Sequence, residues 1–161
     1  SLKSQNINPT LSIHQNDVKM VFHYGDIKIS PKDDVMYYWT KYRKVHYTQG
    51  GYAGQLLNGK YEEYFISGQL KTNGSFKKGA KIGEWKIWFE NGITEEFCYW
   101  VKGLKHGKYI KYYDSGSIKE EGQYKLGFRH GTIFKYEIVA VVYISQNTEG
   151  NDCCICPNAT V

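Results

Sequence analysis

The chain has 161 residues, which is enough for one domain with a modest core. It contains 15 Tyr, 7 Phe, 4 Trp and 17 Gly but only 3 Pro, a composition that favours strands and short turns over long helices. The net charge of +5 is spread as Lys alternating with Glu, and without a continuous basic stripe we expect no nucleic-acid partner. The longest apolar run, residues 138–144, is shorter than the roughly 20 residues of a membrane-spanning helix.

Residues 1–34 form the first of three regions. We expect the first dozen residues to be polar and mobile, followed by a capping strand or hairpin between Val18 and Ile29. The chain starts at Ser1 without Met, as expected for a processed form whose targeting peptide has been removed. This leaves an extracytoplasmic location open.

The middle region, residues 35–137, is a repeat with a period of 24 residues. The phrase GKYEEYFISGQLKTNGSFKKGAKI aligns without a gap with GEWKIWFENGITEEFCYWVKGLKH and with GKYIKYYDSGSIKEEGQYKLGFRH. The full units are residues 59–82, 83–106 and 107–130, with a partial unit at 131–137 and a degenerate one at 35–58. Repeats of this kind stack a small unit that cannot bury its own face, which favours a structural or binding role over catalysis.

Two turn signals alternate within each unit and predict β-hairpins. The first is a tight pair, Ser67-Gly68, Asn91-Gly92 or Ser115-Gly116. Asn-Gly is typical of a type I′ turn, in which both central residues have positive φ. The second signal is a longer connection with glycine at both ends, at residues 79–83, 103–107 and 127–131. We therefore expect an all-β fold, an elongated single-layer antiparallel β-meander built from 24-residue hairpin repeats.

Alternation along the strands predicts which side chains share a face. Tyr61, Trp85, Tyr109 and Ile133 occupy one face, and small residues at positions 74, 98 and 122 leave room for a ring to lie across the next strand. A second aromatic row points to the opposite face and comprises Tyr64, Trp88, Tyr112 and Tyr136. Such a row stays partly exposed unless a partner, residues 1–34 or the C-terminal tail covers it. We treat this row as a candidate interaction surface.

The phrase G-x-Y-x-x-Y-x-x-x-G-x-L, followed by an aromatic residue and G-x-x-x-G, resembles the MORN repeat in its bacterial variant form. The segment YYWTKYRKVHYTQGGYAGQLLNGKYEEY is similar to the opening of MORN-variant proteins labelled antitoxin-like, particularly those of Bacteroides-type organisms. The resemblance covers roughly residues 35–137. It implies a meandering antiparallel sheet and a role as an interaction or scaffold module.

Three basic residues, Lys81, Lys105 and Arg129, recur in the longer connection. We expect them to form an exposed basic column along one edge of the sheet. Such a column suits anionic lipid headgroups or an acidic partner, and some MORN proteins have been linked to membranes. The alternative is that exposed turns favour Lys and that the column resists edge aggregation.

No catalytic residue, metal ligand or cofactor site is expected. His106 and His130 share a repeat position, but equivalent residues lie about 9 to 10 Å apart, too far for zinc ligands that each approach the ion to about 2 Å. Adjacent carboxylates such as Glu62-Glu63 point to opposite faces and cannot cooperate as an acid and a base. Three cysteines in the tail, Cys153, Cys154 and Cys156, lack a second ligand pair at zinc-site spacing.

The last region, residues 138–161, combines an apolar run suited to a capping strand with this loosely attached cysteine-containing tail. The sequence as a whole favours a non-enzymatic module that binds another protein through an aromatic and charged sheet surface. Periodic Trp, Tyr and Gly also suit a carbohydrate or cell-envelope binding module, because flat rings stack on sugar faces and quaternary amines. Weak association with anionic lipid through the basic column is a third alternative.

Overall fold

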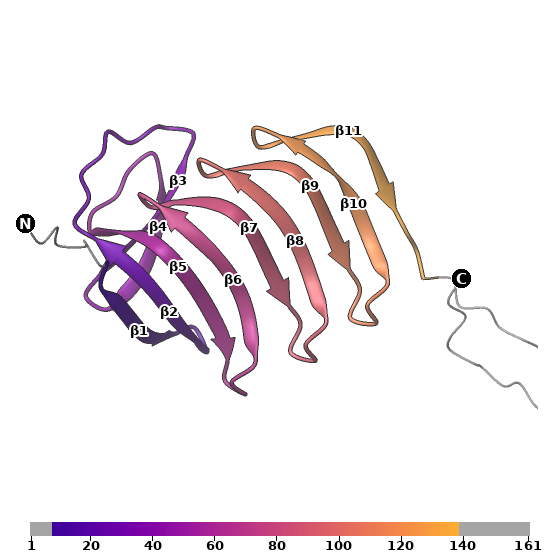
Figure 1. Cartoon of the computed structure of the whole chain (residues 1–161), viewed down its shortest axis with the longest axis horizontal. Coiled ribbons are helices and arrows are strands. Elements are labelled where there is room, and N and C mark those ends of the chain that lie inside the picture. The colour runs from indigo at the N-terminus through magenta and orange to yellow at the C-terminus, as the bar shows by residue number, and fades with distance from the viewer. Residues whose placement is uncertain (1–7, 139–161) are drawn as a thin grey trace, which may run out of the picture.

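The computed structural model describes residues 8–138, which form one antiparallel β-sheet. Its strands are β1 (Thr10–Gln15), β2 (Val18–Gly25), β3 (Met36–Lys41), β4 (Lys44–Gln49), β5 (Gln55–Phe65), β6 (Leu70–Lys77), β7 (Ala80–Trp88), β8 (Thr94–Val101), β9 (Leu104–Tyr112), β10 (Ile118–Lys125) and β11 (Phe128–Lys135). Side by side they follow the order β1-β2-β5-β6-β7-β8-β9-β10-β11, with β3 and β4 off this path (Figure 1). The prediction of an all-β, elongated antiparallel meander is confirmed.

The first two strands form a hairpin at the start of the sheet. Its turn residues Asn16 and Asp17 have φ of 51° and 59°, a backbone conformation that Asn and Asp tolerate better than most residues. Ile13 and Met20 pair across the hairpin, and both are buried. Residues 10–12, which we expected to be mobile, therefore belong to a strand, because alternating apolar side chains among polar neighbours suffice to place β1 on the core. The strand expected from Val18 ends at Gly25.

The degenerate unit forms the β3–β4 hairpin, which leaves the row of strands. β6 pairs with β5 from Gly59 to Tyr64, so on that edge β3 reaches β5 only at Trp39 and Thr40. The hairpin instead crosses one face at the N-terminal end of the sheet (Figure 1). The amide of Tyr38 donates a hydrogen bond of 2.8 Å to the carbonyl of Gly79, which ties the hairpin to the β6–β7 turn. The sheet is therefore covered at this end, and over β9 to β11 the described residues form a single layer.

The two kinds of turn are the reverse of the prediction. Positive φ at both central residues, the mark of a two-residue type I′ turn, occurs at Lys78-Gly79, Lys102-Gly103 and Leu126-Gly127. At the Ser-Gly and Asn-Gly pairs only the glycine is left-handed, as at Gly68 with φ of 87°. There the Gly68 amide donates to the carbonyl of Phe65, and the Phe65 amide donates to Gln69, both at 2.9 Å. This is a three-residue loop in which a type I turn is followed by a left-handed glycine.

The glycines that mark the 24-residue period lie inside strands and not at the ends of wide turns. Gly59, Gly83, Gly107 and Gly131 have φ between 68° and 121°. Each stands where the strand pairing shifts register, for example between Cys98 opposite Tyr109 and Trp100 opposite Lys105. Positive φ at such a bulge favours glycine, because a Cβ would clash with the backbone. The period therefore records a regular bend in every second strand.

The buried core lies between the N-terminal half of the sheet and the β3–β4 hairpin. Some ring pairs in it meet edge to face, as between Phe76 and Trp85, whose centroids are 5.0 Å apart at 74°, and others are tilted, as between Tyr61 and Trp85. Each such pair contributes about 0.5 to 1.5 kcal/mol beyond area burial. One cluster comprises Ile13, Val18, Met20, Phe22, Val45, Leu57, Tyr61, Phe76 and Trp85, and a second comprises Val35, Tyr37, Trp39, Leu56 and Ala80.

Small residues make room for rings on this face, as predicted. A Cβ added at Gly74 would lie 2.3 Å from the ring of Trp85, and one added at Gly122 would lie 3.0 Å from the ring of Tyr109. Cys98, at the same repeat position, pairs with Trp85 on one side and Tyr109 on the other and is buried. The first aromatic column is thus the buried one.

Candidate interaction surface

The seven residues proposed from the sequence lie on two opposite faces of the sheet. Trp85 points into the core, so Trp88, three residues later in β7, points away from it. The row Tyr64, Trp88, Tyr112 and Tyr136 therefore lies on the face opposite the β3–β4 hairpin. Lys81, by contrast, contacts rings of the core face. The structure does not bring the aromatic row and the basic column together.

The basic column is not on an exposed turn. Lys81, Lys105 and Arg129 belong to β7, β9 and β11, where each pairs across a two-residue turn with an aromatic residue of the preceding strand. These partners are Phe76, Trp100 and Tyr124. The prediction of an exposed column is wrong for Lys81 and Lys105, which are half-buried, because it rested on the assumption that residues 79–83 form a wide turn. Arg129 is exposed.

Lys81 lies among three rings on the core face. Its Nζ atom is 4.1 Å from the centre of the Trp85 ring, 5.0 Å from Trp100 and 5.3 Å from Tyr38. These distances are within the range of cation–π attraction. Burial lowers the pKa of Lys81 to about 8, although Glu63 acts in the opposite direction.

The next two cations differ from Lys81 because each has a carboxylate partner. Lys105 Nζ lies 2.7 Å from Glu96 Oε1 and also near the rings of Trp100 and Tyr124. Burial is the largest influence and opposes its charge, but the hydrogen bond to Glu96 and the nearby charge of that carboxylate together outweigh burial, so the pKa of Lys105 is raised. Arg129 Nη2 lies 3.0 Å from Glu120 Oε1. Cations and rings thus alternate along this face. Lys105 and Arg129 are each paired with a carboxylate.

Glu120 also joins the column to the buried rings. The hydroxyl of Tyr109 donates to Glu120 Oε1 at 2.8 Å, and this bond, with Arg129 nearby, lowers the pKa of the Glu120 carboxyl. Burial and the same bond raise the pKa of Tyr109 to about 12. Glu96 and Glu120 are 24 residues apart, and Thr72 holds the equivalent position in the unit of Lys81. Lys81 is therefore the member of the column with no ion pair to a described carboxylate.

The aromatic row remains partly open to solvent. Tyr64, Trp88 and Tyr112 are half-buried, and Tyr136 is 43% exposed. Hydroxyls at both ends of the row are fixed by carboxylates: Tyr64 donates to Glu62 at 3.1 Å, and Tyr136 donates to Glu121 at 3.0 Å. The described part of residues 1–34 extends the sheet sideways and leaves this row uncovered.

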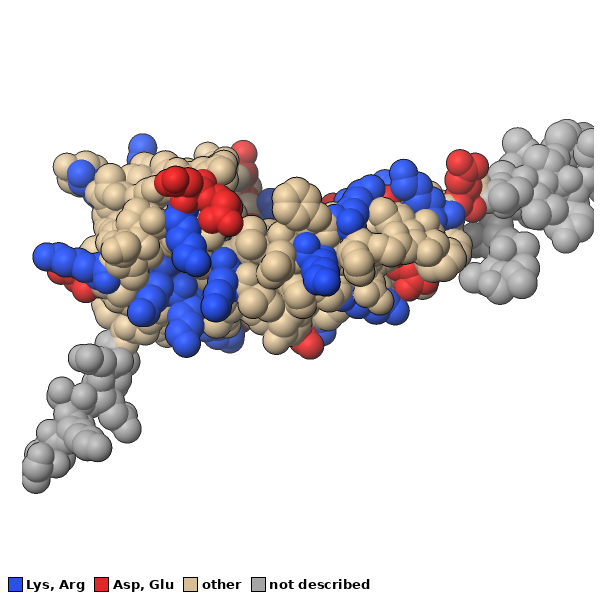
Figure 2. Space-filling model, turned by 90° about the horizontal axis from the view of Figure 1, so that it is seen from above, with Lys and Arg blue, Asp and Glu red and all other residues tan. Residues whose placement is uncertain are grey.

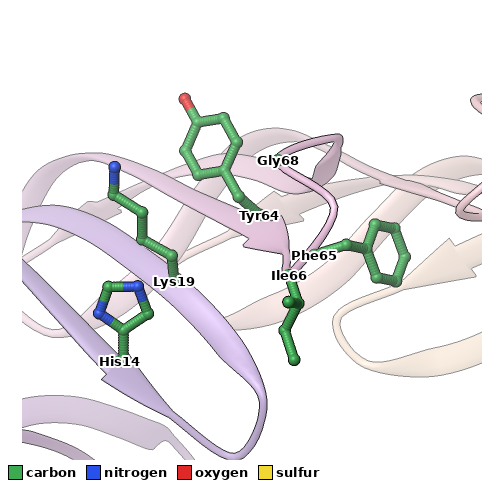
Figure 3. A pocket seen from close by; sticks show the side chains of 6 residues that line it. All are labelled: His14, Lys19, Tyr64, Phe65, Ile66 and Gly68. Carbon is green, nitrogen blue, oxygen red and sulfur yellow. The ribbon is translucent and has the colours of Figure 1, made fainter.

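Tyr64 also lines a shallow hollow of about 420 Å³ at the end of β1, β2 and β5. Its other lining residues are His14, Lys19, Phe65, Ile66 and Gly68. The Lys19 amine lies 6.0 Å from the centre of the Tyr64 ring, and both side chains extend to the same side of the ribbon (Figure 3). This end of the aromatic row therefore combines rings with a cation.

Charge on the surface is distributed and mixed in sign. On the face seen in Figure 2, Lys and Arg side chains form separate groups with Asp and Glu among them. Two carboxylates near the aromatic row carry lysine partners, Lys60 with Glu62 at 2.7 Å and Lys108 with Glu121 at 3.2 Å. A partner on that face would contact aromatic rings with both positive and negative side chains beside them.

The two histidines have different environments. His106 Nδ1 accepts a hydrogen bond of 3.4 Å from the amide of Leu126 in the β10–β11 turn. Asn58 holds the same repeat position and accepts from the amide of Lys78 at 2.9 Å, so this position serves the turns. His130 is exposed on β11. Within residues 8–138, the structure shows no cluster of three or more His, Cys, Asp or Glu side chains placed to hold a metal ion.

The remaining sequence features carry no site in the described region. Glu62 bonds Tyr64 while Glu63 bonds Thr72 and Tyr61, which places these adjacent carboxylates on opposite faces. Cys98 is a free, buried thiol whose pKa is raised by burial to about 11. Cys153, Cys154 and Cys156 lie outside the described residues. No helix in the described region is long and apolar enough to cross a membrane.

The sequence contains a signal for the pairing of each cation with an aromatic residue across the turn, but this pairing was not predicted. An aromatic residue is followed five positions later by a cation in every full unit, as in Phe76 and Lys81. Because the turn between them has two residues, this spacing makes the two side chains direct cross-strand neighbours. The contribution of Tyr38 has no such signal, because it depends on the hairpin crossing the sheet.

No protein-family model matches the chain, and no curated protein matches it.

Proposed function

We propose that this protein is a non-enzymatic interaction module of the MORN-variant type, whose open sheet face binds another protein. The observation that carries the proposal is the row Tyr64, Trp88, Tyr112 and Tyr136. It recurs once per repeat on the face that no described segment covers. Partly exposed aromatic rows of this kind mark binding surfaces.

The surroundings of the row support a protein partner. Rings framed by Lys60, Glu62, Lys108 and Glu121 combine apolar contact area with charges of both signs, as in the centre and rim of protein interfaces. The basic column offers less to an anionic membrane, because Lys105 and Arg129 are already paired with Glu96 and Glu120. An ion pair of this kind leaves little free charge for lipid headgroups.

A photo-crosslinking amino acid placed at Trp88 tests the proposal. We expect a covalent adduct with one protein in cells that naturally make the chain. The matched control carries the crosslinker at Tyr42, an 85% exposed aromatic position in the β3–β4 turn. The same adduct formed equally from position 42 would contradict the proposal.

The carbohydrate alternative predicts a different result. A saturable change in Trp fluorescence with a sugar identified on a glycan array, abolished by Trp88→Ala and accompanied by no protein adduct, would replace a protein partner by a glycan. Sedimentation with vesicles containing phosphatidylserine tests the lipid alternative, for which Lys81→Glu should abolish binding.

A further inference from the structure

The two edges of the sheet differ. At β1, Arg43 Nη2 donates to the carbonyl of Ser12 at 3.4 Å, and the Gln15 amide group bonds both the amide and the carbonyl of Val45 at 2.9 and 3.0 Å. The β3–β4 hairpin thus covers part of that edge. At the other end β11 pairs with β10 alone among the described strands, and it closes the row in Figure 1.

The backbone groups on the outer edge of β11 are directed as they are in a strand that pairs with a neighbour. The amide of Tyr136 donates to Lys119 of β10 at 3.0 Å, so by alternation Ile133 and Lys135 direct their backbone groups outward. The equivalent segments of the earlier units, Gly83–Trp88 and Gly107–Tyr112, each carry a further strand on that edge. Within residues 8–138, no strand therefore pairs with the outer edge of residues 131–136.

Large apolar side chains accompany this edge. Phe128 is 79% exposed, Phe134 is 53% exposed and Ile138 is 62% exposed. In the earlier units a left-handed glycine, such as Gly116 with φ of 90°, returns the chain to form the next strand. The sequence has Ala140 where the earlier units have this glycine. The sequence after β11 thus lacks the glycine that precedes a further strand in the earlier units.

We propose that β11 pairs with β11 of a second copy of this chain, antiparallel about a two-fold axis at Ile133. The ladder covers Gly131 to Lys135, with Ile133 opposite its own copy. Residues opposite each other in an antiparallel ladder have their side chains on the same face, and this register satisfies that condition. It also places the outward-directed backbone groups of the two copies opposite each other.

Side-chain complementarity selects this register. Just beyond the ladder it brings Arg129 near Glu137 of the second copy, and Phe128 near Ile138, twice each by symmetry. Shifting the axis to Thr132 would place Arg129 opposite Lys135, which is a repulsive pair. Shifting it to Phe134 removes the Arg129 and Glu137 contact. The covered β1 edge disfavours head-to-tail growth, so pairing closes at a dimer.

Such an interface is small, so we expect a concentration-dependent dimer. Sedimentation equilibrium of the full 18.7 kDa chain from about 1 μM to 1 mM should show a monomer that converts to a dimer. Glu137→Arg, which places two arginines near each other, should raise the dissociation constant at least tenfold. Glu95→Arg, on β8 away from this edge, should leave it unchanged.

A disulfide test reports the register. With Cys153, Cys154 and Cys156 replaced by Ser, Ile133→Cys should form a disulfide-linked dimer on mild oxidation, because directly paired strand residues suit disulfide geometry. Tyr47→Cys, on exposed β4, and Phe134→Cys should not. A chain that stays monomeric throughout the concentration range, or one in which Phe134→Cys links more readily than Ile133→Cys, would overturn the proposal.

Discussion

The Nζ atom of Lys81 lies 4.1 Å from the centre of the Trp85 ring, the shortest distance between a cation and a ring in the described sheet. Burial among the rings holds the pKa of this ammonium at about 8, below its value of 10.5 in the unfolded chain. Between these two pH values the folded protein binds fewer protons than the unfolded one. The contribution of Lys81 to stability therefore rises as pH rises through this interval.

Replacing Lys81 by Met should remove that contribution. Each pKa unit corresponds to about 1.4 kcal/mol. The free energy of unfolding of wild type, relative to that of Lys81→Met, should therefore rise by about 3 kcal/mol between pH 8 and pH 10.5. Urea unfolding across this range measures the difference. Parallel stability curves would contradict the buried environment of Lys81.

Gly74 and Gly122 offer a matched pair for the crossing rings. A Cβ at Gly74 meets the ring of Trp85 at 2.3 Å inside the core, whereas one at Gly122 meets Tyr109 at 3.0 Å in the single-layer region. We expect Gly74→Ala to destabilise the fold by about 3 kcal/mol and Gly122→Ala by about 1 kcal/mol, in the range of overpacked sites. Thermal and urea unfolding of both variants would test this order.

Adjacent carboxylates on opposite faces should respond differently to truncation. Glu120→Ala leaves the buried Tyr109 hydroxyl without its acceptor and should cost about 2 kcal/mol. Glu121→Ala removes surface contacts to Lys108 and Tyr136 and should cost clearly less than Glu120→Ala. Glu120→Gln keeps an acceptor for Tyr109 and should recover part of the loss. Equal costs for the two alanine variants would argue against the internal role of Glu120.

The two turn types predict different sensitivity to alanine. Gly68 has φ of 87° and open space around it, so Gly68→Ala should cost about 1 kcal/mol for backbone strain alone. Gly79 has φ of 79° and a Cβ there would lie 2.6 Å from Leu56, so Gly79→Ala should cost at least twice as much. Equilibrium unfolding distinguishes the two, and similar costs would mean that the hairpin does not press on this turn.

The period and the strand alternation were sufficient to predict the meander and the two aromatic rows, because both depend on local pattern. The turn types were misjudged because Asn91-Gly92 is by composition the stronger signal for a two-residue turn. The glycine-to-glycine segment 79–83 was taken as a wide turn, but Gly83 lies at a register shift inside β7 and the turn itself has two residues. That error also moved Lys81 onto an exposed edge. The path of the β3–β4 hairpin was not predictable, because it depends on competition with β6 for one edge of β5.

Both apolar clusters lie at the N-terminal end, while β9 to β11 contact mainly their neighbours. In a linear array of this kind, each unit is stabilised by the one before it. Amide hydrogen exchange should therefore be slowest in β5 to β7 and grow faster strand by strand toward β11. Local unfolding would therefore begin at the C-terminal end of the sheet. The strands covered by the β3–β4 hairpin would unfold last.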